Sequence, residues 1–519
     1  MADVRIAHWR TRYRMPADAV RERPRLDGVL KSALDDELFA AALQRAGIPA
    51  GEEICIRRVE SVVRLDSGQP DGRLAVAWSV ALADAIAQCV SAGGPDVIRY
   101  GTRFVALVDM ACSAARGDLE RAWAWRSLGI WHAPDARDAR EACAEVIEVL
   151  TREPRLAPAT LGVVARRGLL PPLIASVPAD RWVMLARTSL VASGVSEADA
   201  ERLFSSSGSV EAEVGEDGGV AATTRAVARM CGSSALLDAL REVNSVDRLL
   251  AGSTIEAIAA MALLDCEPAL VASADLRDVV RSIAQHIAAR AVAVTADKAS
   301  RVERVRSQAQ RDEKRLESPE RRPTELASGA KDEEAHGISA ADVESPDDAR
   351  TPATTAWGGL LFLLHIVHAV DLPAVLQRDS ALNTRSLRWT LHQLAMLIAP
   401  IAADDPAALA FAGLAPGSRC PSDDEQPPTE AELAAVHSAH AVVVAAVRER
   451  INAIIDNDEP DAALIHRVTS RNAEIVAEPA WIEVRLLASE IDTNVRRAGL
   501  DLDPGWIPWL GAVVRFTYV

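Results

Sequence analysis

Residues 496–519 read RRAGLDLDPGWIPWLGAVVRFTYV, and the interpretation of the whole chain starts from this stretch. It holds two tryptophans and two prolines at turn positions. After them, the β-forming residues Val514, Phe516 and Tyr518 are separated by single polar residues, which is the period of a strand with one buried face. A loose segment is usually polar and rich in Gly and Ser. We therefore expect an aromatic strand here, packed against the core.

Two further stretches share a resemblance with residues 499–518. They read RIAHWRTRYRMP at 5–16 and WGGLLFLLHIVH at 357–368. Together the three resemble a family of uncharacterised proteins encoded in gene clusters for extracellular, phage-tail-like contractile injection systems. The resemblance implies protein partners, namely the sheath, the baseplate or an AAA-type ATPase of such a particle, and it implies no catalytic residues. Ala512 and Thr517 stand where the family has Arg and His, so neither position is expected to do chemistry.

The composition predicts a mainly α, multi-domain protein. A chain of 519 residues is too long for one ordinary core and suggests two or three domains. Its apolar content is mostly Ala, Leu and Val, with only 4% aromatic residues, which favours helices packed closely on helices. The net charge of −17 argues against a general nucleic-acid binder, because such a protein needs a basic face.

Four regions are expected along the chain. They are an N-terminal mixed α/β region (1–132), a helical domain (133–300), a disordered charged linker (301–355) and a C-terminal helical region that ends in β-strands (356–519). The linker is predicted because no aromatic residue occurs in it and large aliphatic residues are rare. Such a segment cannot bury enough apolar surface to offset an ordering entropy of about 1–2 kcal/mol per residue.

A small β element is expected from strands near the two termini. Val4–Tyr13 is predicted to be a strand that pairs with the final one. The other predicted elements are one helix over Asp27–Ala46, a β-rich segment at Glu53–Leu65, a helix over Arg73–Ser91, a helical hairpin of Val97–Arg116 and Asp118–Leu128, buried helices at Trp357–Val370 and Thr384–Leu397, and a strand in Ile475–Leu487 that begins after Pro479. Thr429 and Glu432 form a capping-box pattern at the start of a long helix, Thr429–Ile455.

The sequence predicts a cytoplasmic protein without a membrane span. The opening MADVRIAHWR lacks the apolar core of a signal peptide. The apolar runs Ala356–Val370 and Ala439–Val447 are shorter than the roughly 18–20 residues that cross a bilayer. Seven well-separated cysteines include no CxxC pair, so neither a disulfide framework nor a zinc knuckle is expected.

The common catalytic motifs are absent, and two histidine patterns remain to be weighed. The sequence has no Walker loop, no Rossmann fingerprint, no G-x-S-x-G and no H-E-x-x-H. Two pairs of histidines three residues apart lie in predicted helices, His365/His368 and His437/His440. Each pair could offer two imidazoles to a zinc ion, with His392 or His466 as a third ligand. Because no Cys or carboxylate stands at ligand spacing beside them, we interpret them as ordinary helix histidines.

A second metal pattern is better explained by a turn. Asp501, Asp503 and Gly505 resemble the start of a calcium loop, but Ala512 stands where the bidentate Glu is needed. The sequence Asp503-Pro504-Gly505 fits a type II turn. No metal and no cofactor are therefore expected.

Six residues are candidates for contacts with other proteins: Trp506, Trp509, Arg10, Arg12, Trp123 and Trp125. Trp123 and Trp125 cannot share a helix face, so one is expected in the core and the other at an edge or interface. Trp506 and Trp509 are either core residues or, where exposed, binding hot spots. The arginine cluster around Arg10 and Arg12 is either a solvated face or a contact for an acidic protein partner.

The expected function is that of a non-enzymatic accessory, assembly or scaffold protein of a contractile injection system. It would act through protein–protein contacts, without nucleic acid. A metal-dependent hydrolase that uses the paired H-x-x-H helices is one alternative. A cargo or effector carried by the particle is another.

Overall fold

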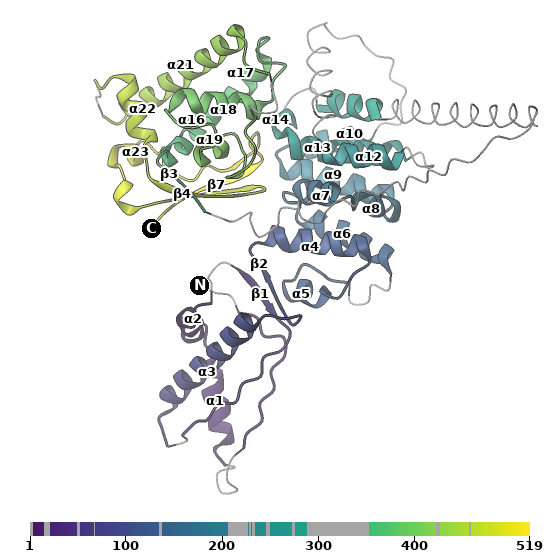
Figure 1. Ribbon diagram of the computed structural model, residues 1–519, viewed down its shortest axis with the longest axis vertical. Coiled ribbons are helices and arrows are strands. Elements are labelled where there is room, and N and C mark those ends of the chain that lie inside the picture. The colour runs from purple at the N-terminus through teal and green to yellow at the C-terminus, as the bar shows by residue number, and fades with distance from the viewer. Residues whose placement is uncertain are drawn as a thin grey trace, which may run out of the picture. The chain divides into compact units, whose positions relative to one another are not determined.

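The structure is a computed structural model that describes residues 4–14, 21–48, 52–66, 68–133, 138–205, 227, 230, 234–244, 250–271, 276–287, 352–421, 426–455 and 458–519. The chain divides into two compact units, Met1–Glu153 with Pro172–Val177 and Pro154–Pro171 with Pro178–Val519. Helices dominate each unit, and a small β element lies toward each end of the chain (Figure 1). The predicted mainly α class is therefore confirmed.

Three helices enclose the first apolar core of the first unit: α1 (Arg23–Ala33), α2 (Asp36–Arg45) and α3 (Asp71–Ala92). Leu30 and Trp78 are buried between them. The helix predicted at Arg73–Ser91 is confirmed as α3, which stops at Gly93 with φ +65°, a backbone conformation that favours glycine.

The single helix predicted over Asp27–Ala46 is wrong, because Asp35 divides it. Asp35 has extended backbone angles, and its carboxylate accepts a hydrogen bond from the amide of Glu37. This is the chemistry of an N-cap, which starts a new helix. A continuous leucine period could not reveal the break.

A two-stranded antiparallel sheet of β1 (Glu53–Ile56) and β2 (Val97–Tyr100) follows. The predicted β-rich segment Glu53–Leu65 is a strand only over its first four residues, because β2 offers no longer partner. The helix predicted from Val97 is also wrong at its start, since residues 97–100 form β2. The remaining helices of this part are α4 (Arg103–Arg116), α5 (Ala122–Ser127) and α6 (Ala139–Arg152).

The N-terminal segment Val4–Tyr13 forms no strand and joins no sheet within the described residues. The predicted pairing of strands from the two ends is therefore wrong. The final strand of the chain instead pairs with two strands that lie close to it in the sequence, at 481–486 and 505–507.

Helices also form the first part of the second unit: α7 (Ala157–Arg166), α9 (Ala179–Ala192), α10 (Glu197–Phe204), α12 (Ala235–Asn244), α13 (Gly252–Cys266) and α14 (Pro268–Val271). A further helix, α8 (Leu170–Ser176), spans the boundary between the units. Helix α13 packs against α7, α9 and α12, and its alanine-rich sequence is buried on nearly every side. A helix that is apolar all round belongs in the centre of such a layer.

The second part of this unit is built on a five-stranded sheet in the order β3-β4-β5-β7-β6. Its strands are β3 (Ala353–Thr355), β4 (Ala473–Glu478), β5 (Trp481–Leu486), β6 (Gly505–Ile507) and β7 (Ala512–Tyr518). Strands β5 and β7 are parallel, and the other neighbours are antiparallel. Val514 is fully buried and Phe516 nearly so, so the expected aromatic strand against the core is confirmed.

Two of these strands contradict the sequence-based expectation. Ile475–Leu487 holds a hairpin of two strands, β4 and β5, where one strand after Pro479 was predicted. The turn residue Ala480 has φ +64°, which is rare for a residue other than glycine, so the sequence carried no turn signal. Strand β3 lies inside the end of the predicted linker (301–355); residues 301–351 of that linker lie outside the described residues.

The helices described in this part of the chain are η3 (Gly358–Leu363), α16 (Leu364–Ala369), α17 (Leu372–Arg378), α18 (Leu387–Ile398), α19 (Pro406–Phe411), α21 (Glu430–Asn452), α22 (Asp461–Thr469), η4 (Ala488–Glu490) and α23 (Thr493–Arg497). Both η3 and α19 pack on the strands, while α18 and α21 form an outer layer (Figure 1). The helix predicted at Trp357–Val370 begins as a 3-10 helix. There a Cβ on Gly359 would lie 2.2 Å from the Val468 carbonyl oxygen, so only glycine allows this close approach.

The predicted capping box is confirmed at the start of α21. The Thr429 hydroxyl accepts from the Glu432 amide, and the Glu432 carboxylate accepts from the Thr429 amide at 2.7 Å.

Candidate functional site

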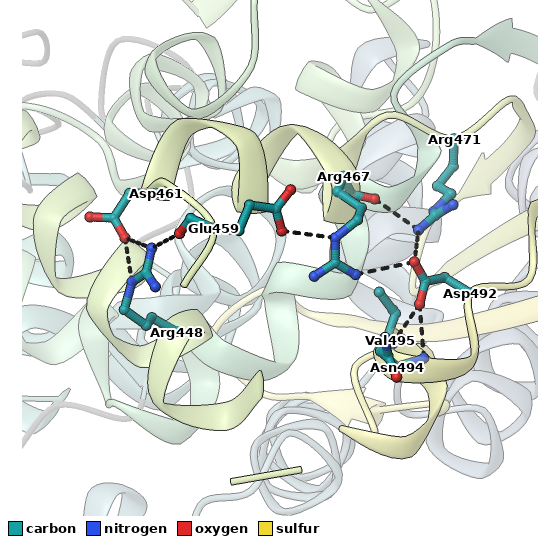
Figure 2. Close-up of polar contacts among 8 residues, drawn as sticks. All are labelled: Arg448, Glu459, Asp461, Arg467, Arg471, Asp492, Asn494 and Val495. Atoms are coloured by element: carbon teal, nitrogen blue, oxygen red, sulfur yellow. Dashed lines mark hydrogen bonds and ion pairs between the residues drawn. The ribbon is translucent and has the colours of Figure 1, made fainter. Parts of the chain in front are cut away.

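A row of arginines and carboxylates runs between three helices of the second unit (Figure 2). Its members are Arg448, Glu459, Asp461, Arg467, Arg471 and Asp492. On α21, Arg448 pairs with Asp461 at the start of α22. On α22, Arg467 reaches Glu459 at 3.1 Å and Asp492 at 3.2 Å. The row therefore ties α21, α22 and the start of α23 together.

The carboxylate of Asp492 is the centre of this row. It accepts from the amides of Asn494 and Val495 at 2.8 and 3.1 Å, which caps α23. Burial alone would raise the pKa of Asp492, but these two amides and Arg467 outweigh it, so the pKa lies below its ordinary value. A carboxylate held ionised by so many donors is suited to joining helices and poorly suited to exchanging protons.

A second carboxylate, Glu432 in the first turn of α21, forms a buried ion pair with Arg385. Arg385 donates to its two oxygens from Nε at 2.7 Å and from Nη2 at 3.1 Å. Both side chains are less than one-tenth exposed, and the guanidinium also lies over the Trp389 ring at 4.4 Å. The bonds from Arg385 come first among the causes that lower the pKa of Glu432 to about 2, the Thr429 bonds add to them, and burial opposes them. The capping-box signal identifies Glu432 in the sequence, but nothing there reveals Arg385, which is 47 residues away.

The first unit holds a comparable cluster around Asp109, which no sequence motif reveals. Tyr100 donates its hydroxyl to the Asp109 carboxylate at 2.7 Å, and the Trp125 indole donates to the same hydroxyl at 2.9 Å. Arg121 completes the cluster at 2.9 Å from the other carboxylate oxygen. Burial, followed by the charge and the bond of Asp109, raises the pKa of Tyr100, so its hydroxyl is a structural donor.

The first H-x-x-H pair lies on α16 and faces the loop before the last strand. A ring nitrogen of His365 is hydrogen-bonded to the Leu502 carbonyl. The Nδ1 atom of His368 accepts from the Trp509 indole at 3.2 Å. Both imidazoles therefore hold the loop that carries Trp509.

The second pair lies on α21. The ring of His437 donates to the Leu433 carbonyl of its own helix at 2.7 Å. Burial, and then the neighbouring His437, lower the pKa of His440, so this imidazole is neutral at physiological pH.

The two histidines suggested as a third ligand are also engaged in packing. The ring of His392 is completely buried and donates to the Ala403 carbonyl at 2.7 Å. The ring of His466 packs edge-on against Trp357 with centroids 5.5 Å apart. Across the described residues, no three His, Cys, Asp or Glu side chains are grouped so as to hold a metal ion.

Three described cysteines, Cys55, Cys143 and Cys266, have thiols whose pKa is raised by burial, which disfavours reactivity. Burial raises the pKa of Cys55 to about 11 and that of Cys266 to about 12. A thiol nucleophile needs the opposite shift.

The contacts of two aspartates show how the suggested turn is held. Asp503 accepts from the Phe516 amide of β7 at 2.7 Å, and Asp501 accepts from the Tyr518 hydroxyl at 2.8 Å. Gly505 has φ +71°, as the third position of a type II turn requires. Both carboxylates therefore fasten the turn to the last strand.

Of the candidate tryptophans, Trp509 and Trp125 lie in the cores of their units. Trp506 is half-buried, with the Arg155 guanidinium over its ring at 4.5 Å. Trp123 is half-buried at an edge under Arg57 at 5.1 Å, so Trp123 and Trp125 divide between edge and core as expected.

The remaining candidates, Arg10 and Arg12, lie on an exposed segment that we call the N-terminal arm (residues 4–14). Only Thr11 and Tyr13 of the arm are even partly buried. Tyr13 anchors it: its hydroxyl donates to Asp27 at 2.6 Å, and its ring packs edge-on against Trp78 at 6.3 Å between centroids.

A groove of about 470 Å³ lies between the N-terminal arm and α1. Its lining is Trp9, Thr11 and Tyr13 of the arm with Arg23, Asp27, Leu30 and Lys31 of α1 and Leu34, the C-cap of that helix. The sequence identified the arginines but not this groove, because a strand was expected in place of an exposed arm.

No protein-family profile, curated protein or solved structure matches this chain.

Two helices among the described residues, α3 and α21, are long and apolar enough to cross a membrane by length and composition; the bent pair of η3–α16 with α17 is a third candidate. About a third of each long span is buried inside the protein. A search for uninterrupted apolar runs in the sequence does not find these two helices, because isolated polar residues interrupt their apolar stretches.

Proposed function

We propose that this chain is a non-enzymatic accessory or assembly protein of a contractile injection system, which works in the cytoplasm by binding other proteins of the particle. The partners proposed are the sheath, the baseplate or an AAA-type ATPase. The proposal rests first on the resemblance of residues 5–16, 357–368 and 499–518 to the family encoded in such gene clusters.

The observation that carries the proposal is the state of the N-terminal arm. It coincides with one of the three resembling stretches, yet it is exposed and its Arg10 and Arg12 have no partner among the described residues. In contrast, Glu432, Asp492, His368 and Asp501 of the second unit hold helices, turns and strands together. These four side chains therefore support a structural role, and the arm supports a contact surface.

Affinity purification of the tagged chain from cells that express the whole gene cluster tests the proposal. Recovery of a sheath, baseplate or ATPase component is expected. Recovery of none of them would contradict it.

Two simple measurements separate the alternatives. One zinc ion per purified chain would favour the metal-dependent hydrolase with paired histidine helices. Toxicity on expression in a target cell would favour a cargo or effector.

A further inference from the structure

The backbone of residues 6–14 of the N-terminal arm is open to pairing. Within the described part of the chain, residues 6–14 make no backbone–backbone hydrogen bond and belong to no sheet. Exposed peptide groups in an extended segment are the edge to which another strand can add.

The side chains of the arm divide between two sides. Trp9, Thr11 and Tyr13 line the groove, and this spacing of two is the period of an extended chain. The other side is therefore shared by Arg10, Arg12 and Arg14, and all three are exposed. The arm thus presents a row of arginines beside its open edge.

The charge around the groove is unbalanced. Arg10, Arg12, Arg14, Arg23 and Lys31 make no ion pair with any described residue. The one carboxylate that lines the groove, that of Asp27, already accepts the hydrogen bond of the tyrosine anchor. Like charges so arranged repel each other and are stabilised by a partner of opposite charge.

We infer that the N-terminal arm binds an extended acidic peptide segment of a partner protein, which adds as a strand along residues 8–14. Its carboxylates stand at every second position, opposite Arg10, Arg12 and Arg14, because cross-strand neighbours interact in pairs on one face. Trp9, which is 39% exposed at the groove, provides the contact for an apolar side chain of that peptide. This inference rests on the proposed function and specifies the chemistry of one partner.

A protein partner fits the arm better than a nucleic acid does. The chain carries a net charge of −17, so a polyanion that extends beyond the arm meets repulsion, whereas a short acidic peptide does not.

The test measures, by fluorescence anisotropy, how tightly a fluorescein-labelled peptide, Thr-Glu-Val-Glu-Thr-Glu-Val, binds to the full chain. Binding in the micromolar range is expected, and it should weaken as sodium chloride is raised from about 50 to about 500 mM. The triple variant Arg10→Glu, Arg12→Glu, Arg14→Glu is expected to weaken it at least about tenfold. The variant keeps its fold, because these three side chains contact no core.

Two controls isolate the mechanism. The variant Arg73→Glu, Arg116→Glu, Arg140→Glu makes the same charge change at exposed positions of the same unit and is expected to bind like the wild type. A peptide with the same composition but adjacent glutamates should bind several-fold more weakly, because its carboxylates cannot face alternate positions.

The inference would be overturned if both triple variants bound the peptide equally well. Tighter binding of a single-stranded RNA oligonucleotide than of the peptide would also overturn it. Failure of the proposed function is separately visible. If the particle co-purifies with the arm variant as well as with the wild type, the proposed function stands and the inference is wrong. If the peptide binds the arm but no particle component is recovered, the inference stands and the proposed function is wrong.

Discussion

The Glu432→Gln substitution tests how the buried ion pair holds α21 in place. In the native protein the Glu432 carboxylate receives two bonds from Arg385 and one from the Thr429 amide. Glutamine keeps the shape and some of these bonds but removes the charge. The guanidinium of Arg385 then remains buried opposite a neutral group, which is the costly way to break such a pair.

The magnitude follows from the pKa of Glu432, which is lowered from 4.5 to about 2. That difference corresponds to about 3 kcal/mol of stability at neutral pH. Because the folded-state pKa is depressed, the stabilisation is complete above the unfolded pKa of about 4.5 and is lost as pH falls toward 2. We expect Glu432→Gln to lower the free energy of unfolding by about 2–3 kcal/mol at pH 7 and by less than half of that at pH 3.

Urea unfolding at several pH values, with hydrogen exchange on α18 and α21 as a local readout, measures this effect. Glu430→Gln is the matched control, because Glu430 is an exposed residue in the same first turn; it should change stability by less than about 0.5 kcal/mol. A control that costs as much as Glu432→Gln would refute the reasoning. So would a difference between wild type and Glu432→Gln that stays constant from pH 7 to pH 3.

Three further predictions concern other parts of the fold. Gly359→Ala should destabilise the second unit by more than about 3 kcal/mol in urea unfolding, because its Cβ would lie 2.2 Å from the Val468 carbonyl; Gly252→Ala, where the space is open, should be neutral or stabilising by up to about 1 kcal/mol. Asp492→Ala should cost about 2–4 kcal/mol, because a helix cap and two arginine contacts are lost together; unchanged hydrogen exchange in α23 would contradict this. Tyr100→Phe should cost about 1–3 kcal/mol in thermal unfolding, since the half-buried Asp109 carboxylate loses one donor and the Trp125 indole loses one of its two acceptors; a wild-type melting temperature would contradict this.

The sequence predicted those features that depend on local patterns. The alternation of Val514, Phe516 and Tyr518 identified the last strand, because a strand with one buried face has a period of two. The pattern at Thr429 and Glu432 identified the helix start, because both partners of a capping box lie within four residues.

The missed features depend on contacts that no local pattern records. The hairpin of β4 and β5 turns at an alanine with positive φ, where the usual turn signal is glycine or asparagine. Arg385 meets Glu432 only when α18 and α21 pack side by side. The N-terminal arm has the alternation of a strand, but strand formation also needs a neighbour with free peptide groups, and the predicted partner β7 already lies between β5 and β6.

Co-purification of the tagged chain with the assembled particle tests the central claim most directly. The chain is proposed to act by being bound by other proteins, so sheath, baseplate or ATPase components should be recovered with the wild type in fixed ratio. They should be reduced with the Arg10, Arg12, Arg14 variant. Co-purification with no particle component would contradict the account, and one zinc ion per molecule would then favour the metal-dependent hydrolase.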